Sequence, residues 1–245
     1  MSKFFLVGGA VRDLVLGVTP SDMDYVVEIS SFEALIEACK DAGFLPVPNA
    51  NTESGFVEFP DTLGLKCMCP VLKQVVDIHC SRKEFNYRDG AHPEKVVVGS
   101  LFEDAERRDF TCNQLLLERG CYDLDRIIDI HRGIQHIEEG TLWCVGEPEE
   151  RLAENPDRAI RAFRFAIRYG WDFSKPLHDA LTIGSPIIEL VRRENDDRKL
   201  KSVNKILSDK SNYLKFFTYM ADYPEIAKAI FSNIGLIASN QGQFK

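Results

Sequence analysis

The segment 3–27, KFFLVGGAVRDLVLGVTPSDMDYVV, decides the fold of the first part of the chain. Its apolar run 3–7 stops at Gly8-Gly9, and residues 10–16 then follow helical periodicity up to Gly17. After the turn around Pro20, residues 22–27 alternate with period two, as a half-buried strand does. The chain is therefore predicted to begin with a strand, a tight glycine turn, a helix and a second strand.

The remaining sequence divides into a strand-rich and a helix-rich part. We expect an amphipathic helix over 32–42, strands over 55–59, 63–67 and 71–80, and a polar loop over 83–95. From about residue 101 helical periodicity dominates, and a turn-rich stretch at 120–148 contains a possible strand at 127–130. The pattern indicates an α+β fold, with a mixed-sheet domain followed by a helical one and a boundary near 140–155.

The composition is that of a globular protein. Its 245 residues, 44% hydrophobic and 28% charged, allow one large or two small domains and exclude a disordered tail. No apolar run approaches the ~20 residues of a membrane span, and the N-terminus lacks a signal-peptide pattern, so we expect a cytoplasmic protein without a membrane partner. The odd number of cysteines, seven, fits reduced and buried thiols better than disulfides or a zinc site.

Charge is unevenly distributed along the chain. The formal net charge is −8, which argues against a general nucleic-acid binder with a basic surface. Residues 1–106 nevertheless hold 9 basic and 17 acidic residues, whereas the window 151–215 holds 14 basic and 9 acidic. This segregation suits a protein that collects cations in one part and a polyanion in another; solvated helix faces explain it equally well on charge alone.

Three carboxylates form a candidate metal site. Period-two geometry puts Asp22 and Asp24 on one strand face, and Asp77 lies within another apolar strand. Like charges at such spacing are costly without a cation between them, and oxygen donors suit Mg²⁺, which points to a two-metal site for phosphoryl transfer. The Gly8-Gly9 turn would let a phosphate approach backbone N–H groups at a helix start. Alternatively, Asp22 caps a turn and the other two acids are ordinary surface residues.

The motifs, taken in order, resemble the class II tRNA nucleotidyltransferases and bacterial poly(A) polymerases of the polymerase-beta-like superfamily. The first motif is LVGGAVRD at 6–13 with Asp22-x-Asp24, and Val76-Asp77-Ile78 with the later 89–93 segment resembles the third-carboxylate strand and its flexible loop. RRDFTCN at 107–113, IDI at 128–130 with Gly133, and ENPDRAIRAFRFA at 154–166 resemble the second, third and fourth motifs.

The resemblance implies a role for each matched residue. Asp22 and Asp24 would hold metal ions, and Asp77 would face the RNA 3′-hydroxyl. The glycine turn would contact the triphosphate through Gly8, Gly9 and Arg12. The second motif would bind ribose and phosphate through Arg108, Asp109 and Asn113. The fourth motif would bind the base through Asn155 and Arg158, with Arg161 in support.

The fourth motif departs from the family at one position, since Asn155 stands where the family has Asp. An aspartate only accepts hydrogen bonds, as the amines of C and A require, whereas an asparagine both donates and accepts. We expect Asn155 to turn its oxygen toward the amine, so that Asn155→Asp sharpens selectivity; the alternative is a helix cap and nothing more. Arg158, Arg161, Arg164 and Arg168 form one stripe opposite an apolar face, and the outer two are expected to be ordinary helix-surface residues.

The family resemblance implies a nucleotidyltransferase head over 1–140, a helical neck over 141–207 and a truncated helical body over 208–245. The expected function is metal-dependent, template-independent addition of nucleotides from CTP and ATP to the 3′ end of tRNA, with Mg²⁺ as cofactor and pyrophosphate as product. Alternatives are poly(A), CC-only or A-only addition, another RNA acceptor, or a catalytically silent nucleotide- or RNA-binding protein. Because much of the family's tRNA-gripping body and tail has no counterpart in these residues, a homodimer is also expected to be feasible.

Overall fold

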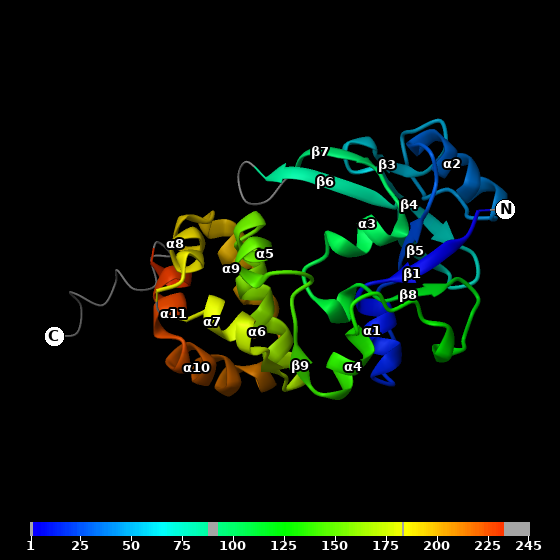
Figure 1. The fold of residues 1–245 in the computed structure, drawn as a ribbon. Coiled ribbons are helices and arrows are strands. Elements are labelled where there is room, and N and C mark those ends of the chain that lie inside the picture. The colour runs from blue at the N-terminus through cyan, green and yellow to red at the C-terminus, as the bar shows by residue number, and fades with distance from the viewer. Residues whose placement is uncertain (1, 88–92, 183, 233–245) are drawn as a thin grey trace. The chain divides into compact units, whose positions relative to one another are not determined.

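A computed structural model describes residues 2–87, 93–182 and 184–232. They form two compact units: the first contains the described residues up to Ile137 except Tyr87, and the second contains Tyr87 and the described residues from Glu138 onward (Figure 1). The first unit is built on a mixed sheet and the second is largely helical. The predicted α+β fold is therefore confirmed.

The sheet of the first unit has six strands in the order β3-β4-β5-β2-β1-β8. All neighbouring pairs are antiparallel except β2 and β5, which run parallel. The strands are β1 (Phe4–Val7), β2 (Asp24–Val27), β3 (Val57–Phe59), β4 (Gly64–Cys69), β5 (Gln74–Cys80) and β8 (Leu116–Glu118). The predicted N-terminal strand, glycine turn, helix and second strand are thus all present.

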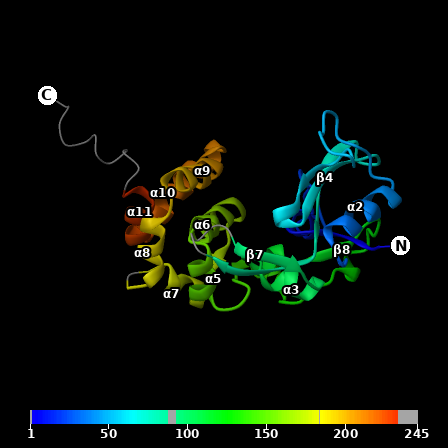
Figure 2. The same cartoon turned by 90° about the horizontal axis from the view of Figure 1, so that it is seen from above.

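The two faces of this sheet have different neighbours. Phe4, Tyr25 and Phe44 make ring contacts on the face that α2 (Phe32–Asp41) covers, next to β5 (Figure 2). On the opposite face Phe5 and Val26 belong to a buried cluster that Leu101 of α3 packs against. Because side chains alternate along a strand, Asp24 lies on the same face as Val26.

Short helical elements complete the first unit. The glycine turn leads into α1, Ser31 caps α2 through its hydroxyl, and Ser100 and Glu103 form a capping box at the start of α3. The elements are α1 (Gly9–Val15), α3 (Leu101–Glu106), α4 (Gly133–Glu138), and three 3₁₀ turns, η1 (Pro60–Thr62), η2 (Thr111–Asn113) and η3 (Leu124–Arg126).

Four local predictions need correction. The segment 83–95 was expected to be a loop, but β6 (Arg82–Tyr87) and β7 (Pro93–Val98) pair as a two-stranded sheet; residues 89–92 of the expected flexible loop lie outside the described residues. The strand predicted over 22–27 begins only at Asp24, and the one over 71–80 begins at Gln74 after a turn. The possible strand at 127–130 is reduced to one bridge between Leu116 and Ile128.

The second unit is organised around α6, whose inner face is buried. Ala159, Ala162, Phe163 and Ala166 are fully covered, as the stripe pattern predicted, and α6 packs against α9. Phe163 also makes edge-to-face contacts with Phe173 and Tyr223. The elements are β9 (Thr141–Leu142), α5 (Pro148–Glu154), α6 (Asp157–Tyr169), β10 (Asp172–Phe173), α7 (Lys175–Ala180), α8 (Pro186–Arg193), α9 (Asp196–Leu207), η4 (Lys210–Asn212), α10 (Tyr213–Asp222) and α11 (Pro224–Phe231).

Two further expectations concern the whole chain. In the part of the chain that the structure describes, no helix has the length and apolar character needed to cross a bilayer. All seven cysteines are free thiols and all but Cys121 are buried, as expected for structural cysteines.

Candidate active site

Two of the three predicted carboxylates lie side by side in the sheet. Asp24, the first residue of β2, is the register partner of Asp77 on the parallel strand β5, so both side chains leave the same face of adjacent strands. Asp22 was expected on that strand face, but it lies in the exposed segment before β2 and accepts a hydrogen bond from the Ser21 hydroxyl. The strand starts too late to align Asp22 by alternation, so its position depends on the preceding turn.

Like charge accumulates around Asp24. Loss of hydration raises the pKa of Asp24, the charges of Asp77 and Asp22 raise it further, and Arg108 and Lys66 lower it. Lys66, on β4, is the register neighbour of Asp77 and places its ammonium 3.4 Å from Oδ2 of that carboxylate. Lys66 on β4, Asp77 on β5 and Asp24 on β2 therefore lie in one row across the sheet. Within this row Lys66 neighbours Asp77, and Asp24 has only Asp77 beside it.

This donor set fits a hard cation that a substrate helps to hold. In the described residues, no group of three or more His, Cys, Asp or Glu side chains forms a metal cage by itself. Mg²⁺ seldom needs such a cage, because one or two carboxylates together with substrate phosphates hold it. Asp24 and Asp77 supply adjacent carboxylates, and the pKa of Asp24 is raised by loss of hydration and, next, by the charges of Asp77 and Asp22, which a bound cation would offset. They fit as the protein's share of a magnesium site.

The glycine turn lies directly beside these carboxylates. Val7, the last residue of β1, pairs with Asp24, so Gly8 leaves the sheet next to it. Gly8 has φ +66°, a left-handed conformation that costs a residue with a Cβ about 1 kcal/mol or more. A Cβ on Gly8 would stand 3.5 Å from Nη1 of Arg108, and one on Gly9 would stand 3.1 Å from Nη2 of Arg12. Two guanidinium groups therefore lie over the bare backbone of this turn.

The predicted residues of the first and second motifs form one buried network. Arg12 donates to Oδ1 of Asn113 at 2.6 Å and, through Nε and Nη2, to Asp13. Asn113 in turn donates from Nδ2 to Asp109 at 2.9 Å, and Asp109 also accepts the backbone N–H of Phe110. Arg12, Asp109 and Asn113 are each less than 8% exposed. These hydrogen bonds hold the start of α1 against η2, so Arg12, Asp109 and Asn113 fix the position of the glycine turn.

Arg108 is aimed by an aspartate that the sequence reasoning missed. The side chain of Asp104 is completely buried and accepts from Arg108 through Nε and Nη2 and, on its other oxygen, from Arg107 through the same two atoms. Burial alone would raise the pKa of Asp104, but the two guanidinium groups hold it well below its ordinary value. The i, i+3 and i, i+4 spacing of an acid and two arginines was the signal available in the sequence.

The third motif has a structural role in this arrangement. Asp129 accepts the backbone N–H groups of Gly133 and Ile134 and the side-chain amide of Gln114, at 2.6–2.9 Å, and thereby holds the start of α4. A Cβ on Gly133 would stand 2.3 Å from the carbonyl oxygen of Thr111. Only glycine fits where α4 meets η2.

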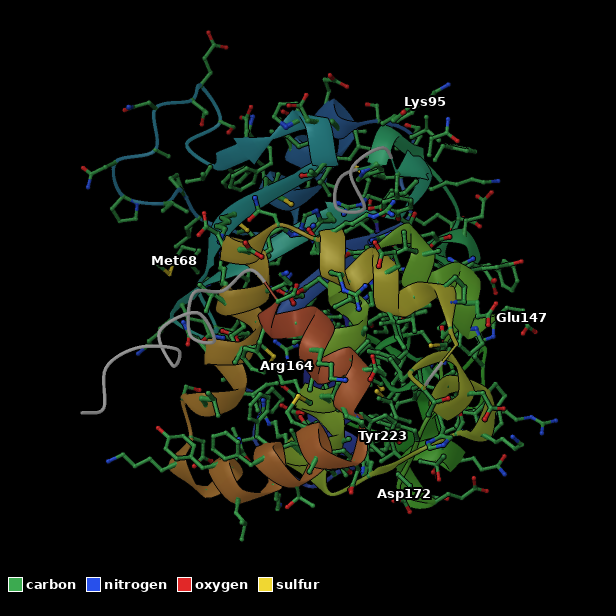
Figure 3. All side chains as sticks on the ribbon, turned by 90° about the vertical axis from the view of Figure 1, so that its left-hand side faces the viewer. Met68, Lys95, Glu147, Arg164, Asp172 and Tyr223 are labelled. Carbon is green, nitrogen blue, oxygen red and sulfur yellow. The ribbon has the colours of Figure 1, made fainter. Side chains whose placement is uncertain are left out.

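The fourth motif lies in the second unit, at the junction of α5 and α6. The Asn155 side chain accepts the backbone N–H of Asp157, the expected capping contact, at 3.2 Å. Arg158 is buried and donates from Nη1 to Glu154 at 2.6 Å and to the carbonyl of Arg151. Arg161 and Arg164, the latter labelled in Figure 3, lie over the ring of Phe165 on the half-buried side of α6. The structure therefore places Arg161 and Arg164 against the same ring, whereas the guanidinium of Arg158 is directed to α5.

Together, the mixed sheet, the glycine turn and the paired carboxylates define a nucleotidyltransferase fold. The family model described as the poly(A) polymerase head domain matches residues 4–143, which is more than half of the chain. The chain belongs to this family.

The chain is similar to two curated tRNA nucleotidyltransferases and to a solved structure of such an enzyme. The chain is 31% identical over 204 residues to a CCA-adding enzyme of Streptococcus pyogenes serotype M2, covering 83% of this chain and 45% of that one. It is 33% identical over 186 residues to an A-adding tRNA nucleotidyltransferase of Aquifex aeolicus, covering 74% and 21%. A solved CCA-adding enzyme in an apo form superposes with a TM-score of 0.74 at 24% identity, covering 95% and 51%. The chain thus spans about half the length of these relatives or less.

Proposed function

We propose that this chain adds nucleotides from CTP and ATP to the 3′ end of tRNA and releases pyrophosphate, in the cytoplasm. The observation that carries the proposal is the pairing of Asp24 with Asp77 beside the Gly8 turn, over which Arg108 lies. Carboxylates for a divalent ion next to a cation-lined glycine turn are the groups that a triphosphate requires. The relatives' names, CCA-adding enzyme and A-adding tRNA nucleotidyltransferase, support tRNA as the acceptor.

In the proposed reaction, the 3′-hydroxyl of the RNA attacks the α-phosphorus and the α–β anhydride bond breaks. Mg²⁺, held with the triphosphate by Asp24 and Asp77 and by Asp22 from the segment before β2, would supply charge neutralisation. Asp77 accepts a hydrogen bond from the attacking hydroxyl and orients it, and Arg108 binds the phosphate oxygens that leave as pyrophosphate. Arg12 acts indirectly, because its guanidinium is committed to Asp13 and Asn113 and fixes the turn.

The second unit supplies the base-reading residues of the proposal. Asn155 and Arg158 occupy the matched positions of the fourth motif, and Arg161 supports them. Arg158 is oriented by its ion pair with Glu154, whose oxygen lies 2.6 Å from Nη1. A protein that selects its substrate with fixed side chains needs no nucleic-acid template.

A second candidate is the same chemistry with a narrower product, namely A-only addition. The Aquifex aeolicus relative, an A-adding tRNA nucleotidyltransferase, favours it, and Asn155 at a base-reading position is a reason to expect altered selection. Poly(A) or CC-only addition uses the same groups. A catalytically silent protein is disfavoured, because the chain keeps adjacent carboxylates that repel each other.

The test is nucleotide incorporation with the products resolved to one nucleotide. Purified protein is incubated with Mg²⁺ and tRNA transcripts that end at the discriminator base, at C or at CC, with each NTP supplied separately and then together. Ordered addition that stops at CCA is the expected result. Addition of A alone, addition of C alone or long A tails would replace the product in the proposal, and no incorporation on any transcript would reject it.

A further inference from the structure

The Asn155 side chain is held from two sides within the second unit. Its Oδ1 accepts the backbone N–H of Asp157 at 3.2 Å and Nη2 of Arg198, from α9, also at 3.2 Å. Asn155 itself has an extended backbone between α5 and α6 and is half-buried. Its amide is therefore not free to take either orientation.

The chemistry of the two partners decides which end of the amide faces them. A backbone N–H and a guanidinium can only donate hydrogen bonds, and the oxygen is the only acceptor of an asparagine side chain. Exchanging oxygen and nitrogen would place donors against donors twice, so the assignment follows from the network. The Nδ2 group must then point away from Asp157 and Arg198, and in the described part of the chain it donates to no protein atom.

Arg198 is itself anchored by a buried acid. Nη1 of Arg198 lies 3.1 Å from Oε1 of Glu194, whose side chain is only 3% exposed and also accepts the backbone N–H of Asn195 at 2.8 Å. A buried carboxylate without a cation is strongly unfavourable, so the pair holds together and Arg198 keeps its place. Glu194 therefore holds Arg198, and Arg198 holds the amide oxygen of Asn155.

We propose that Asn155 presents its Nδ2 amino group to the exocyclic group of the incoming base, and that Arg198, anchored on Glu194, is the positioning residue that maintains this orientation. The proposal rests on the proposed function, because it assumes that position 155 faces the base. It reverses the expectation that the Asn155 oxygen meets the amines of C and A, since that oxygen already has two donors.

The consequence is a changed selectivity. The exocyclic group is an amine in C and A and a carbonyl oxygen in G and U, so an outward donor favours the second pair and an outward acceptor favours the first. An aspartate at position 155 would keep one oxygen on Arg198 and turn the other outward. This chain therefore tolerates UTP and GTP better, relative to CTP and ATP, than its Asn155→Asp variant does.

Nucleotide affinity measured by calorimetry tests the orientation. The full chain is titrated with CTP, ATP, UTP and GTP in Mg²⁺ without RNA, so that no transfer occurs. Asn155→Asp is expected to raise the affinity for CTP and ATP over UTP and GTP by about tenfold or more, the scale of one good base contact. An unchanged ratio, or a shift toward UTP and GTP, overturns the proposal.

Variants of Arg198 test the positioning role. Arg198→Ala leaves one donor in place of two to hold the oxygen, so the amide turns over more readily and the ratio should move toward CTP and ATP. Arg198→Lys retains a second donor and should keep the wild-type ratio. A merely structural role would weaken all four nucleotides alike. Arg193→Ala, which removes an exposed partner of Glu189 on α8, is the matched control and should change nothing.

Different results would reject the proposed function and the orientation of Asn155. If the wild-type chain binds none of the four triphosphates, the proposed function is wrong and this inference falls with it. If all four bind but the ratio is the same in wild type, Asn155→Asp and Arg198→Ala, only the inference is wrong. Ratios of affinities do not depend on the fraction of folded protein, so a destabilised variant remains informative.

Discussion

Replacing Asp104 by Asn tests whether this aspartate organises the arginines of the first unit. The side chain is fully buried and accepts four hydrogen bonds at 2.7–3.2 Å from Arg107 and Arg108, whose side chains are 20% and 16% exposed. The variant keeps the volume but leaves two guanidinium groups without that charge. Breaking a buried pair costs about 3–5 kcal/mol, and Glu84 still compensates Arg107, so we expect a loss of about 3 kcal/mol in the free energy of unfolding.

The assay is urea unfolding followed by circular dichroism at neutral pH. Both tryptophans, Trp143 and Trp171, lie in the second unit, so their fluorescence serves as an internal check that should hardly change. Glu37→Gln is the control, because Glu37 also pairs with a cation three residues away but at 67% exposure, where an ion pair contributes about 0–1 kcal/mol. A loss for Asp104→Asn that is no larger than the loss for Glu37→Gln would refute the reasoning.

The stabilisation that Asp104 provides through Arg107 and Arg108 depends on pH. The folded-state pKa of Asp104 lies below its unfolded value of 3.8, so its contribution is fully present above that value and is lost as the pH falls below it. The stability difference between wild type and Asp104→Asn should therefore shrink on acidification below about pH 4. A difference that stays constant down to pH 2 would contradict the assigned charge state.

Two further predictions concern the packing and the protonation of the first unit. Gly133→Ala should destabilise the unit by more than about 2 kcal/mol, because the new Cβ would overlap the Thr111 carbonyl, whereas Gly120→Ala meets no atom within 4 Å and should cost only about 1 kcal/mol of backbone strain; equal losses in urea unfolding would contradict this. Loss of hydration, aided by the charge of Arg82, lowers the pKa of His79 to about 4, so its stabilising effect is present above its ordinary pKa of 6.5 and is lost between 6.5 and 4. A proton NMR titration of the His79 imidazole should show that low pKa, and a midpoint above 6 would disprove it.

Local signals explain the parts of the fold that the sequence predicted. The strand before Gly8, the helix closed by Gly17 and the amphipathic helix over 32–42 each follow from residues near one another in the chain. The same holds for the buried face of α6, whose alanines and Phe163 recur at helical spacing. The last part of the neck expected over 141–207 contains the helices α8 and α9, and the limits of neck and body stay predictions.

Contacts between distant residues explain what the sequence did not predict. The polar segment 83–95 indicated a loop, yet Lys83 pairs with Glu103 and Glu84 pairs with Arg107, so partners elsewhere in the chain hold the charged strand β6. The contact of Arg198 with Asn155 joins residues 43 positions apart, which no local pattern can show. The placement of Asp22 outside β2 likewise depends on where pairing with β1 and β5 begins.

The central claim is that the Asp24 and Asp77 carboxylates carry out nucleotide transfer, and Asp24→Asn tests it most directly. The measurement is single-turnover incorporation of radiolabelled nucleotide into a tRNA transcript, made alongside urea unfolding of the same sample. Because the substitution removes a carboxylate charge that loss of hydration and the neighbouring acids both disfavour, we expect unchanged or slightly higher stability, together with a loss of transfer of at least about a thousandfold. Transfer within about tenfold of wild type by a folded Asp24→Asn protein would contradict the account.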